Sequence, residues 1–283
     1  MKPKKRGAHR VQDTLLTAFV WIFSFITVGM LLWIFYYILS NGISHITWDF
    51  LTTAYKGKDH GILPMIITTL YIVLISVLIS TPIGICSSIY LTEYSRPGKI
   101  VNLIRFATES LAGIPSIIYG LFGFVFFVVA LKMRFSILSG SLTLSIMVLP
   151  TIIRTTEEAL KSVPIAYREG SLALGATKLW TITRVVLPSA IPGILTAVIL
   201  SIGRIVGETA ALVFTAGTAT QGLNVAITDT SRTLSVHLYM LAKEGLSLNE
   251  TFATATVLII MVAIINFLAS RIASRMKRGT TGV

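Results

Sequence analysis

The sequence predicts an all-α membrane protein with six transmembrane helices. Of the 283 residues, 54% are hydrophobic and only 13% are charged, whereas soluble domains average about 45–50% and about 25%. The apolar residues also fall in long blocks, each near the roughly 20 residues that a helix needs to cross a bilayer. This composition excludes a soluble fold. The single cysteine, Cys86, excludes an internal disulfide and a cysteine-clustered metal site.

Six hydrophobic stretches are candidate spans, and they lie at 14–39, 65–91, 107–131, 137–153, 188–213 and 252–272. The first follows a basic tail, 1–13, as a signal peptide would. Its apolar core is too long for a signal peptide and no small-residue cleavage site ends it, so we interpret it as an uncleaved helix. The third and fourth are separated only by 132–136, which predicts a tight helical hairpin. The other five spans form a core, 65–272, which a tail, 273–283, follows.

The positive charges divide unevenly between the two sides of this topology. Of the 24 Lys and Arg residues, seventeen fall in the N-terminal tail, in 92–106, in 154–187 and after residue 270, whereas six fall in the other loops. Because the cytoplasmic side carries the excess of Lys and Arg, both termini are predicted to be cytoplasmic. The split also accounts for the net charge of +12 without nucleic acid as a partner, since nucleic-acid binding requires a basic patch interleaved with aromatic residues.

Two segments on the outer side are longer than turns. Residues 40–64 contain Asn41, Gly42, Trp48 and the run 57–61, which predicts a short irregular cap. Residues 214–251 begin with small and polar residues and continue into a predicted amphipathic helix around 235–243. This second loop either lines the mouth of a path or roofs the bundle.

The cytoplasmic segment 154–187 carries the most specific pattern. Residues 155–162 are compatible with a helix that Pro164 interrupts, and a second helix, 165–174, is expected to stop at Gly175. Thr177 can then cap a helix that leads into the fifth span. The middle of the segment is rich in small residues, and Gly170 and Gly175 each reduce helix stability by up to about 1 kcal/mol relative to Ala. A helix lying on lipid headgroups gains nothing from them, so the pattern favours docking to another protein.

Glu169, Gly170 and Ser171 are followed after three residues by Gly175 and after nine more by 185–188, which ends in Leu187-Pro188. This spacing resembles the EAA loop of ABC-transporter permeases, in which Glu-Ala-Ala, three residues, Gly and nine residues precede Ile-x-Leu-Pro. The resemblance implies that the segment contains a coupling helix seated in a cleft of an ATPase subunit. The chain has no Walker-type phosphate loop, so ATP and Mg²⁺ are expected on that partner, and no cofactor is expected in this chain.

Further stretches, at 112–123, 155–164, 202–209 and 216–217, resemble phosphate-specific permeases. Within such a system, residues 157–160 and 214–218 resemble PstA more than its partner PstC. The resemblance implies the type I ABC importer permease fold in a bacterial or archaeal cell membrane. It also implies a second, PstC-like permease, ATP-binding subunits, an extracytoplasmic phosphate-binding protein, membrane lipid around the helices, and inorganic phosphate as the transported solute.

Two charges fall inside the fifth span, where an isolated charge costs about 2.5–3.5 kcal/mol on insertion scales. Arg204 and Glu208 are four residues apart, so they are expected to share a helix face and to be able to pair. Gly203 and Gly207 flank them at small-xxx-small spacing, which permits close helix approach or exposes backbone N–H groups to a ligand. The pair is either a salt bridge that fixes packing or part of an anion path, in which a guanidinium suits a phosphate oxyanion.

No catalytic centre is legible in the sequence. His9, His45, His60 and His237 lack metal-ligand spacing, and no nucleophile lies in a pattern with a base. Glu109 is expected at a helix N-terminus, and hydroxyls such as Ser76, Ser80 and Thr143 are expected to bond carbonyls of their own helices. A permease subunit of an ATP-driven phosphate importer is therefore predicted. The alternatives are a permease for another oxyanion, such as phosphonate or sulfate, and an intramembrane lipid-modifying enzyme.

Overall fold

The computed structural model describes residues 6–280 except 57, 58, 97, 221, 223–225 and 246. Nearly all of them are helical, which confirms the all-α class. The α-helices are α1 (Arg6–Gly42), α2 (Trp48–Thr52), α3 (Leu63–Ile89), α4 (Lys99–Ala112), α5 (Ser116–Gly123), α6 (Ile137–Lys161), α7 (Ile165–Ala173), α8 (Lys178–Thr181), α9 (Leu187–Gly207), α10 (Ala210–Thr215), α11 (Leu234–Glu244) and α12 (Leu248–Thr280). The shorter elements are the 3₁₀ turn η1 (Ile43–His45), the π segments η2 (Tyr90–Tyr94), η3 (Phe124–Ala130) and η4 (Ile182–Val186), and the antiparallel strands β1 (Tyr55–Lys56) and β2 (Asp59–His60).

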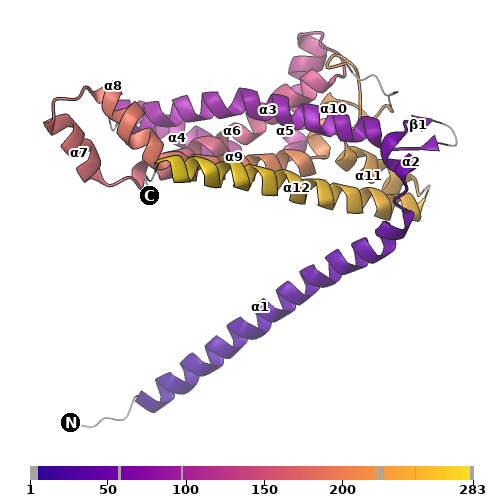
Figure 1. Cartoon of the computed structure of the whole chain (residues 1–283), viewed down its shortest axis with the longest axis horizontal. Helices are drawn as coiled ribbons and strands as arrows, with labels where there is room; N and C mark the ends of the chain where they lie inside the picture. Colours follow the sequence, from indigo (N-terminus) through magenta and orange to yellow (C-terminus); the bar gives the residue numbers. More distant parts are fainter. Residues whose placement is uncertain are drawn as a thin grey trace.

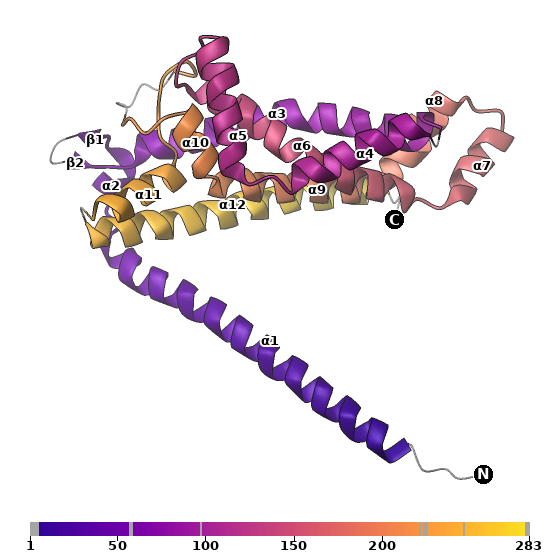
Figure 2. The same cartoon turned by 180° about the vertical axis from the view of Figure 1, so that it is seen from behind.

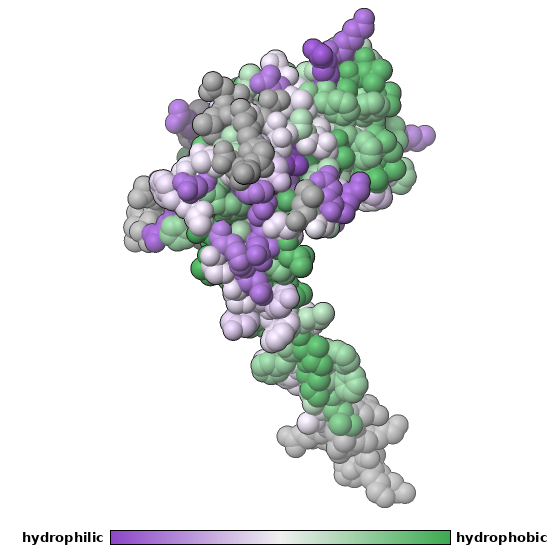
Figure 3. All heavy atoms as spheres, turned by 90° about the vertical axis from the view of Figure 1, so that its right-hand side faces the viewer, coloured by the Kyte–Doolittle hydropathy of each residue, from purple (hydrophilic) through white to green (hydrophobic). Residues whose placement is uncertain are grey.

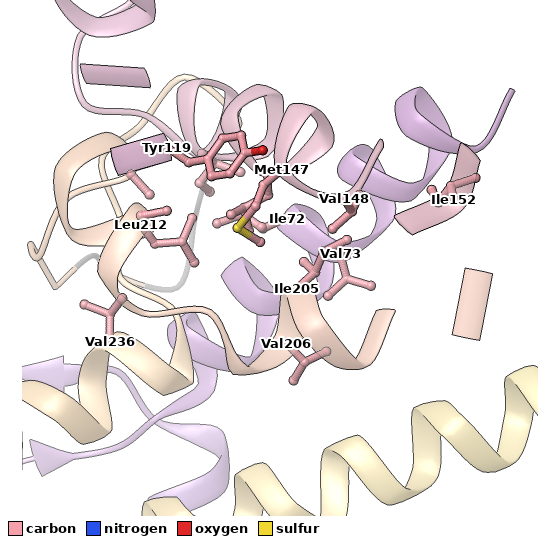
Figure 4. Close-up of a cluster of buried hydrophobic side chains, with 14 residues drawn as sticks. Ile72, Val73, Tyr119, Met147, Val148, Ile152, Ile205, Val206, Leu212 and Val236 are labelled. Atoms are coloured by element: carbon pink, nitrogen blue, oxygen red, sulfur yellow. The ribbon is translucent and has the colours of Figure 1, made fainter. Parts of the chain in front are cut away.

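Four long helices, α3, α6, α9 and α12, lie side by side along the molecule (Figure 1). The central one is α6, since 61% of its most apolar window is buried, against 28% for the spans of α9 and α12. The core cluster joins Ile72 of α3, Met147 of α6 and Ile205 of α9, each about 1% exposed (Figure 4). The expected spans at 65–91, 137–153 and 252–272 are therefore real helices. α3 begins two residues earlier than predicted and passes into η2, α6 ends eight residues later, and α12 is longer at both ends.

Small hydroxyl residues allow α3 and α6 to approach closely. The Ser76 hydroxyl donates to the carbonyl of Ser141 at 3.0 Å, and the Ser145 hydroxyl donates to the carbonyl of Ser76 at 3.3 Å. The expectation that Ser76 bonds within its own helix is therefore wrong, and among the described residues Ser80 has no partner for its hydroxyl. Thr143 does bond the carbonyl four residues before it, at 2.8 Å, as expected.

The predicted third span, 107–131, is two helices with a sharp bend between them. α4 and the helical unit Ser116–Ala130 meet at 102°, and Figure 2 shows α5 rising steeply from the end of α4. Pro115 is extended at the N-cap of α5, and a proline also keeps the residue before it, here Ile114, out of the helical region. The Tyr119 hydroxyl donates to the Leu111 carbonyl across the bend at 2.8 Å. The predicted span 107–131 is thus one span only as a bent pair of helices.

The predicted fifth span, 188–213, is also interrupted. α9 ends at Gly207, Glu208 is extended with ψ at 128°, and the short helix α10 begins at Ala210. α10 packs against α5 with very close backbones: a Cβ at Gly120 would lie 2.8 Å from the Cα of Ala211. The end of the fifth span, α10, therefore packs against α5.

α1 leaves the bundle at a steep angle (Figures 1 and 2). Its C-terminal end touches the start of α12, where Tyr37 meets Phe252 edge to face at 5.5 Å between centroids and the Thr256 hydroxyl donates to the Ile38 carbonyl at 3.3 Å. Gly42 makes this contact possible, because a Cβ there would collide with Thr256. The apolar window of α1 is otherwise 0% buried. The helix begins at Arg6, so part of the predicted tail 1–13 is helical, whereas residues 1–5 lie outside the described residues.

The predicted cap, 40–64, folds into η1, α2 and a β-ladder that pairs Tyr55 with His60. The amphipathic helix predicted around 235–243 is α11 (Figure 1). The view onto this end of the molecule shows hydrophilic residues gathered between apolar flanks (Figure 3). Here the Arg232 guanidinium lies 5.1 Å from the Tyr55 ring centroid, and the buried His237 ring meets the same ring edge to face at 5.2 Å.

Candidate functional sites

The segment between α6 and α9 forms an exposed loop with three short helical pieces at the end of the bundle opposite the cap (Figure 1). Pro164 is extended at the N-cap of α7, and Gly175 has φ at +84° directly after that helix. The Thr177 hydroxyl accepts a hydrogen bond from the Trp180 N–H at 3.3 Å and so caps α8. The predicted Pro164 interruption, glycine stop and threonine cap are all confirmed. The helix expected at 155–162 is the last part of α6, which runs unbroken to Lys161.

The residues of the Glu-Gly-Ser motif occupy different environments on α7. Glu169 and Gly170 are exposed, and a Cβ built at Gly170 or at Gly175 meets nothing within 4 Å. Ser171 is 8% exposed, and its hydroxyl lies 2.8 Å from that of Thr181 on α8. The serine that replaces an alanine of the motif therefore fastens α7 to α8. The glycine at 170 is not required by packing inside this chain, so its outward surface is open to a partner.

The Leu187-Pro188 end of the motif begins the long helix α9. Pro188 lies in the first turn of α9, which continues η4 with helical backbone at Val186 and Leu187. Leu187 packs against a small cluster that includes Leu160 and Val186, both fully buried. The loop therefore joins α9 to the end of α6 through a packed apolar contact.

Sequence reasoning missed a buried ion pair behind this loop. Arg168 of α7 donates from Nε and Nη2 to Oε1 of Glu93 at 3.1 and 2.8 Å, and their side chains are only 16% and 9% exposed. Arg168 precedes the motif directly, which is a weak signal. Glu93 lies in η2, far away in the sequence, so no local pattern points to it.

A second charged group joins α4 to α6. Oε1 of Glu157 lies 2.7 Å from Nη2 of Arg105 and 2.6 Å from Nζ of Lys161. These residues line a cavity of about 150 Å³, together with Glu109. Glu109 lies in the last turn of α4, which begins at Lys99, so the expectation that its carboxylate meets a helix N-terminus is wrong.

Arg204 and Glu208 lie at the junction of α9 and α10 rather than on one helix. Arg204 is in the last turn of α9, where a cation interacts favourably with the carbonyl end of the helix. Glu208 lies beyond that helix, and its Oε1 accepts a hydrogen bond from the Ala211 N–H at 3.2 Å. The Ser235 hydroxyl donates to the Glu208 carbonyl at 2.7 Å and fixes the extended backbone there. The predicted shared helix face is therefore wrong, because the helix ends between the two residues.

The face around Arg204 is open. A Cβ built at Gly203 or Gly207 meets nothing within 4 Å, so the small-xxx-small spacing serves no helix contact among the described residues. The Arg204 side chain is partly exposed and, in the part of the chain that the structure describes, makes no ion pair at 4.0 Å or less. Its charge acts electrostatically on Tyr119, at the bend between α4 and α5. The junction thus presents a guanidinium beside exposed glycine backbone.

Comparison with known proteins agrees with this arrangement. Residues 80–281 match the family described as "Binding-protein-dependent transport system inner membrane component". The chain belongs to this family. It is a multi-pass membrane subunit of an ABC importer, and it is not itself an enzyme, like the permeases it resembles.

Curated relatives extend the match to nearly the whole chain. The chain is 35% identical to the "Probable ABC transporter permease protein YqgI" of Bacillus subtilis over 92% of this chain and 95% of that protein. It is 32% identical to the "Phosphate transport system permease protein PstA" of Mycobacterium leprae over 93% and 91%, and 35% identical to PstA of Pasteurella multocida over 74% and 75%. The permease is therefore PstA-like, as the sequence motifs indicate.

Solved structures show the same fold. A membrane chain of the MetNI methionine ABC transporter, in an inward-facing conformation, matches with a TM-score of 0.65 at 24% identity, over 76% of this chain and 95% of that one. A chain of the bacterial alginate ABC transporter matches with a TM-score of 0.64 at 19% identity, over 95% of both. At this identity the likeness concerns the fold alone, and it confirms the type I permease architecture.

Proposed function

We propose that this permease belongs to an ATP-driven importer of inorganic phosphate and forms the translocation path with a second homologous permease. The observation that carries the proposal is the placement of Arg204. It lies in the last turn of α9, without an ion pair among the described residues, beside two glycines whose outward face is open. A guanidinium presents a planar fork of donors that matches a phosphate oxyanion, and the phosphate permeases named PstA are among its relatives.

The two ends of the bundle suit the two expected soluble partners. The α7 loop exposes Glu169, Gly170 and Gly175 for an ATPase subunit, and the opposite end carries the hydrophilic cap for a phosphate-binding protein (Figure 3). The start of α1 and the end of α12 lie towards the α7 end (Figure 1). Because Arg154, Lys161, Arg168, Lys178 and Arg184 gather at that end, the positive-inside rule supports a cytoplasmic position for it and for both termini.

Transport by the reconstituted complex tests the substrate. The chain is co-purified with the subunits that assemble with it and is placed in proteoliposomes with the binding protein and ATP. We expect ATP-dependent uptake of radioactive phosphate that an excess of sulfate or phosphonate does not compete away. Equal competition by either anion would assign the site to another oxyanion, and a chain that assembles with no ATPase would contradict the importer.

Orientation is tested by cysteine labelling after Cys86 is replaced. A cysteine at Gly170 should react only from the cytoplasmic side, and one at Trp48, which is 77% exposed, only from outside. Labelling of position 170 in intact cells would reverse the topology.

A further inference from the structure

Arg168 joins the coupling helix to two transmembrane helices at once. Its Nη1 donates to the Val163 carbonyl and its Nη2 to the Leu160 carbonyl, both at 2.8 Å, while Nε and Nη2 bind Glu93. Leu160 lies in the last turn of α6, which ends at Lys161, and Val163 lies just beyond that end. The last carbonyls of a helix have no partner inside the helix. The Arg168 guanidinium therefore hydrogen-bonds carbonyls at the end of α6 and also binds Glu93 in η2, the segment that follows α3.

The position of Glu93 depends on an unusual piece of helix. Glu93 lies in the π segment η2, which continues α3, and single π turns are frequent at functional sites in proteins. A second contact supports the same junction, since Nζ of Lys178 on α8 lies 5.0 Å from the ring centroid of Tyr94. The loop that precedes α9 is thus attached to the end of α3 at two points.

We propose that Arg168 is a positioning residue that makes α7, the end of α6 and the end of α3 one rigid body, so that movement imposed on α7 reaches α3 directly. The inference rests on the coupling role of α7 in the proposed function. Without this contact, α7 would be connected to the bundle through the short link to α6 and through α8 and η4 to α9. Its only remaining attachment to the end of α3, among the described contacts, would be the cation–π contact of Lys178 on α8 with Tyr94. With the Arg168 contact, the displacement also acts on α3, which packs along the length of the central helix α6.

The chemistry of arginine is essential for this arrangement. A lysine ammonium keeps the charge but is a point donor on a flexible stem, whereas the planar guanidinium reaches a carboxylate and two carbonyls in fixed directions. Arg168→Lys should therefore retain an attraction to Glu93 and lose the rigid geometry. Glu93→Gln is the complementary variant, because it removes the charge at η2 and leaves the bonds to Leu160 and Val163 in place.

The distance between α7 and α3 tests the proposal. Cys86 is the single cysteine, it is exposed on α3, and it takes one spin label. A cysteine at the exposed Ala166 on α7 takes the other. In the assembled complex with cysteine-free partner subunits, we expect one narrow distance distribution that stays unchanged when ATP is added. Arg168→Lys and Glu93→Gln should broaden it and make it dependent on ATP. An unchanged distribution in both variants would overturn the proposal.

Phosphate uptake per ATP hydrolysed is the second readout, and it should fall about tenfold in Glu93→Gln, the factor expected for one lost charge-assisted hydrogen bond. Arg154→Lys is the matched control, because its pair with Glu158 is exposed on the surface, and it should keep the normal ratio of uptake to hydrolysis.

If the Arg168→Lys variant fails to assemble, the Glu93→Gln variant decides alone. A narrow distance distribution and a normal ratio of uptake to hydrolysis in that variant would contradict the rigid link. The distance measurement does not depend on which solute is transported. A wrong assignment of phosphate as the solute would be detected separately, by the competition assay.

Discussion

The Glu208 carboxylate binds the backbone N–H of Ala211 at 3.2 Å and not the guanidinium of Arg204. Each charge is therefore stabilised by a different helix end: Arg204 by the carbonyls that end α9, and Glu208 by the N–H groups that begin α10. The two residues form no ion pair with each other. This separation changes what a substitution at Arg204 should do.

Arg204→Gln should abolish phosphate uptake while the complex still assembles and binds ATP. Assembly should persist because Glu208 keeps its hydrogen bond to Ala211 and is not left as an orphan charge. Radioactive uptake and size-exclusion chromatography measure the two properties. The double variant Arg204→Gln with Glu208→Gln should assemble and remain inactive. Uptake near wild type in either variant would refute a substrate role for Arg204.

Gly175→Leu should uncouple ATP hydrolysis from uptake. A leucine at φ +84° is strained by about 1–2 kcal/mol, and its side chain would fill space that is open for a partner. Gly175→Asn separates the two effects, because asparagine tolerates the left-handed region. We expect Asn to restore the fold of the loop, seen as normal retention of the ATPase subunit, whereas Leu should lower the uptake-to-hydrolysis ratio. Coupled transport by the leucine variant would contradict the docking role of the loop.

Gly120→Ala should reduce stability by about 1–3 kcal/mol, the range for an overpacked core. The new methyl group would lie 2.8 Å from the Cα of Ala211, so α5 and α10 would have to separate. Thermal unfolding in detergent measures the change. Gly29→Ala is the matched control, since position 29 is helical and open, and alanine there should be neutral or slightly stabilising. Equal midpoints for the two variants would contradict the close contact.

His237 should make the protein less stable in acid. Burial, followed by the neighbouring charge of Arg232, lowers the pKa of His237 to about 3, against about 6.5 in an unfolded chain. As the pH falls below about 6.5, the unfolded chain binds a proton that the folded one does not. Stability is therefore lost at about 1.4 kcal/mol per pH unit between these two values.

The variant His237→Phe keeps a ring against Tyr55 and removes this titration. Its thermal midpoint should fall less than that of the wild type between about pH 7 and about pH 5. Parallel losses in both proteins would show that His237 does not cause the acid sensitivity.

The loop between α6 and α9 was predictable from the sequence because its chemistry is local. Pro164, Gly175 and Thr177 each determine the backbone within a few residues of themselves. The interruptions at 113–115 and at 208 were not predicted. The average hydropathy of a segment indicates whether it is long and apolar enough to cross a bilayer, but it does not show where a helix bends. Pro115 offered a local signal for the first. The second depends on Ser235, whose hydroxyl holds the Glu208 carbonyl, and no local pattern could reveal it.

Contacts between distant residues account for the remaining gap. The link between Arg168 and Glu93 joins positions 75 residues apart, and the Ser76 hydroxyl bonds a carbonyl of another helix. Both contacts depend on the packing of distant segments against one another, which a local sequence pattern does not specify.

The attachment of α1 divides the chain into parts that can vary independently. The family match begins at residue 80, and α1 touches the bundle near Tyr37 and Gly42. Mutations along most of α1 therefore leave the interior packing of the bundle untouched. We expect this helix to tolerate wholesale exchange between related permeases, provided that the small residue at its junction with α12 is preserved. A fluorescent reporter can therefore be attached to α1, or its sequence changed to favour a different helix partner, without changes to the residues of the bundle.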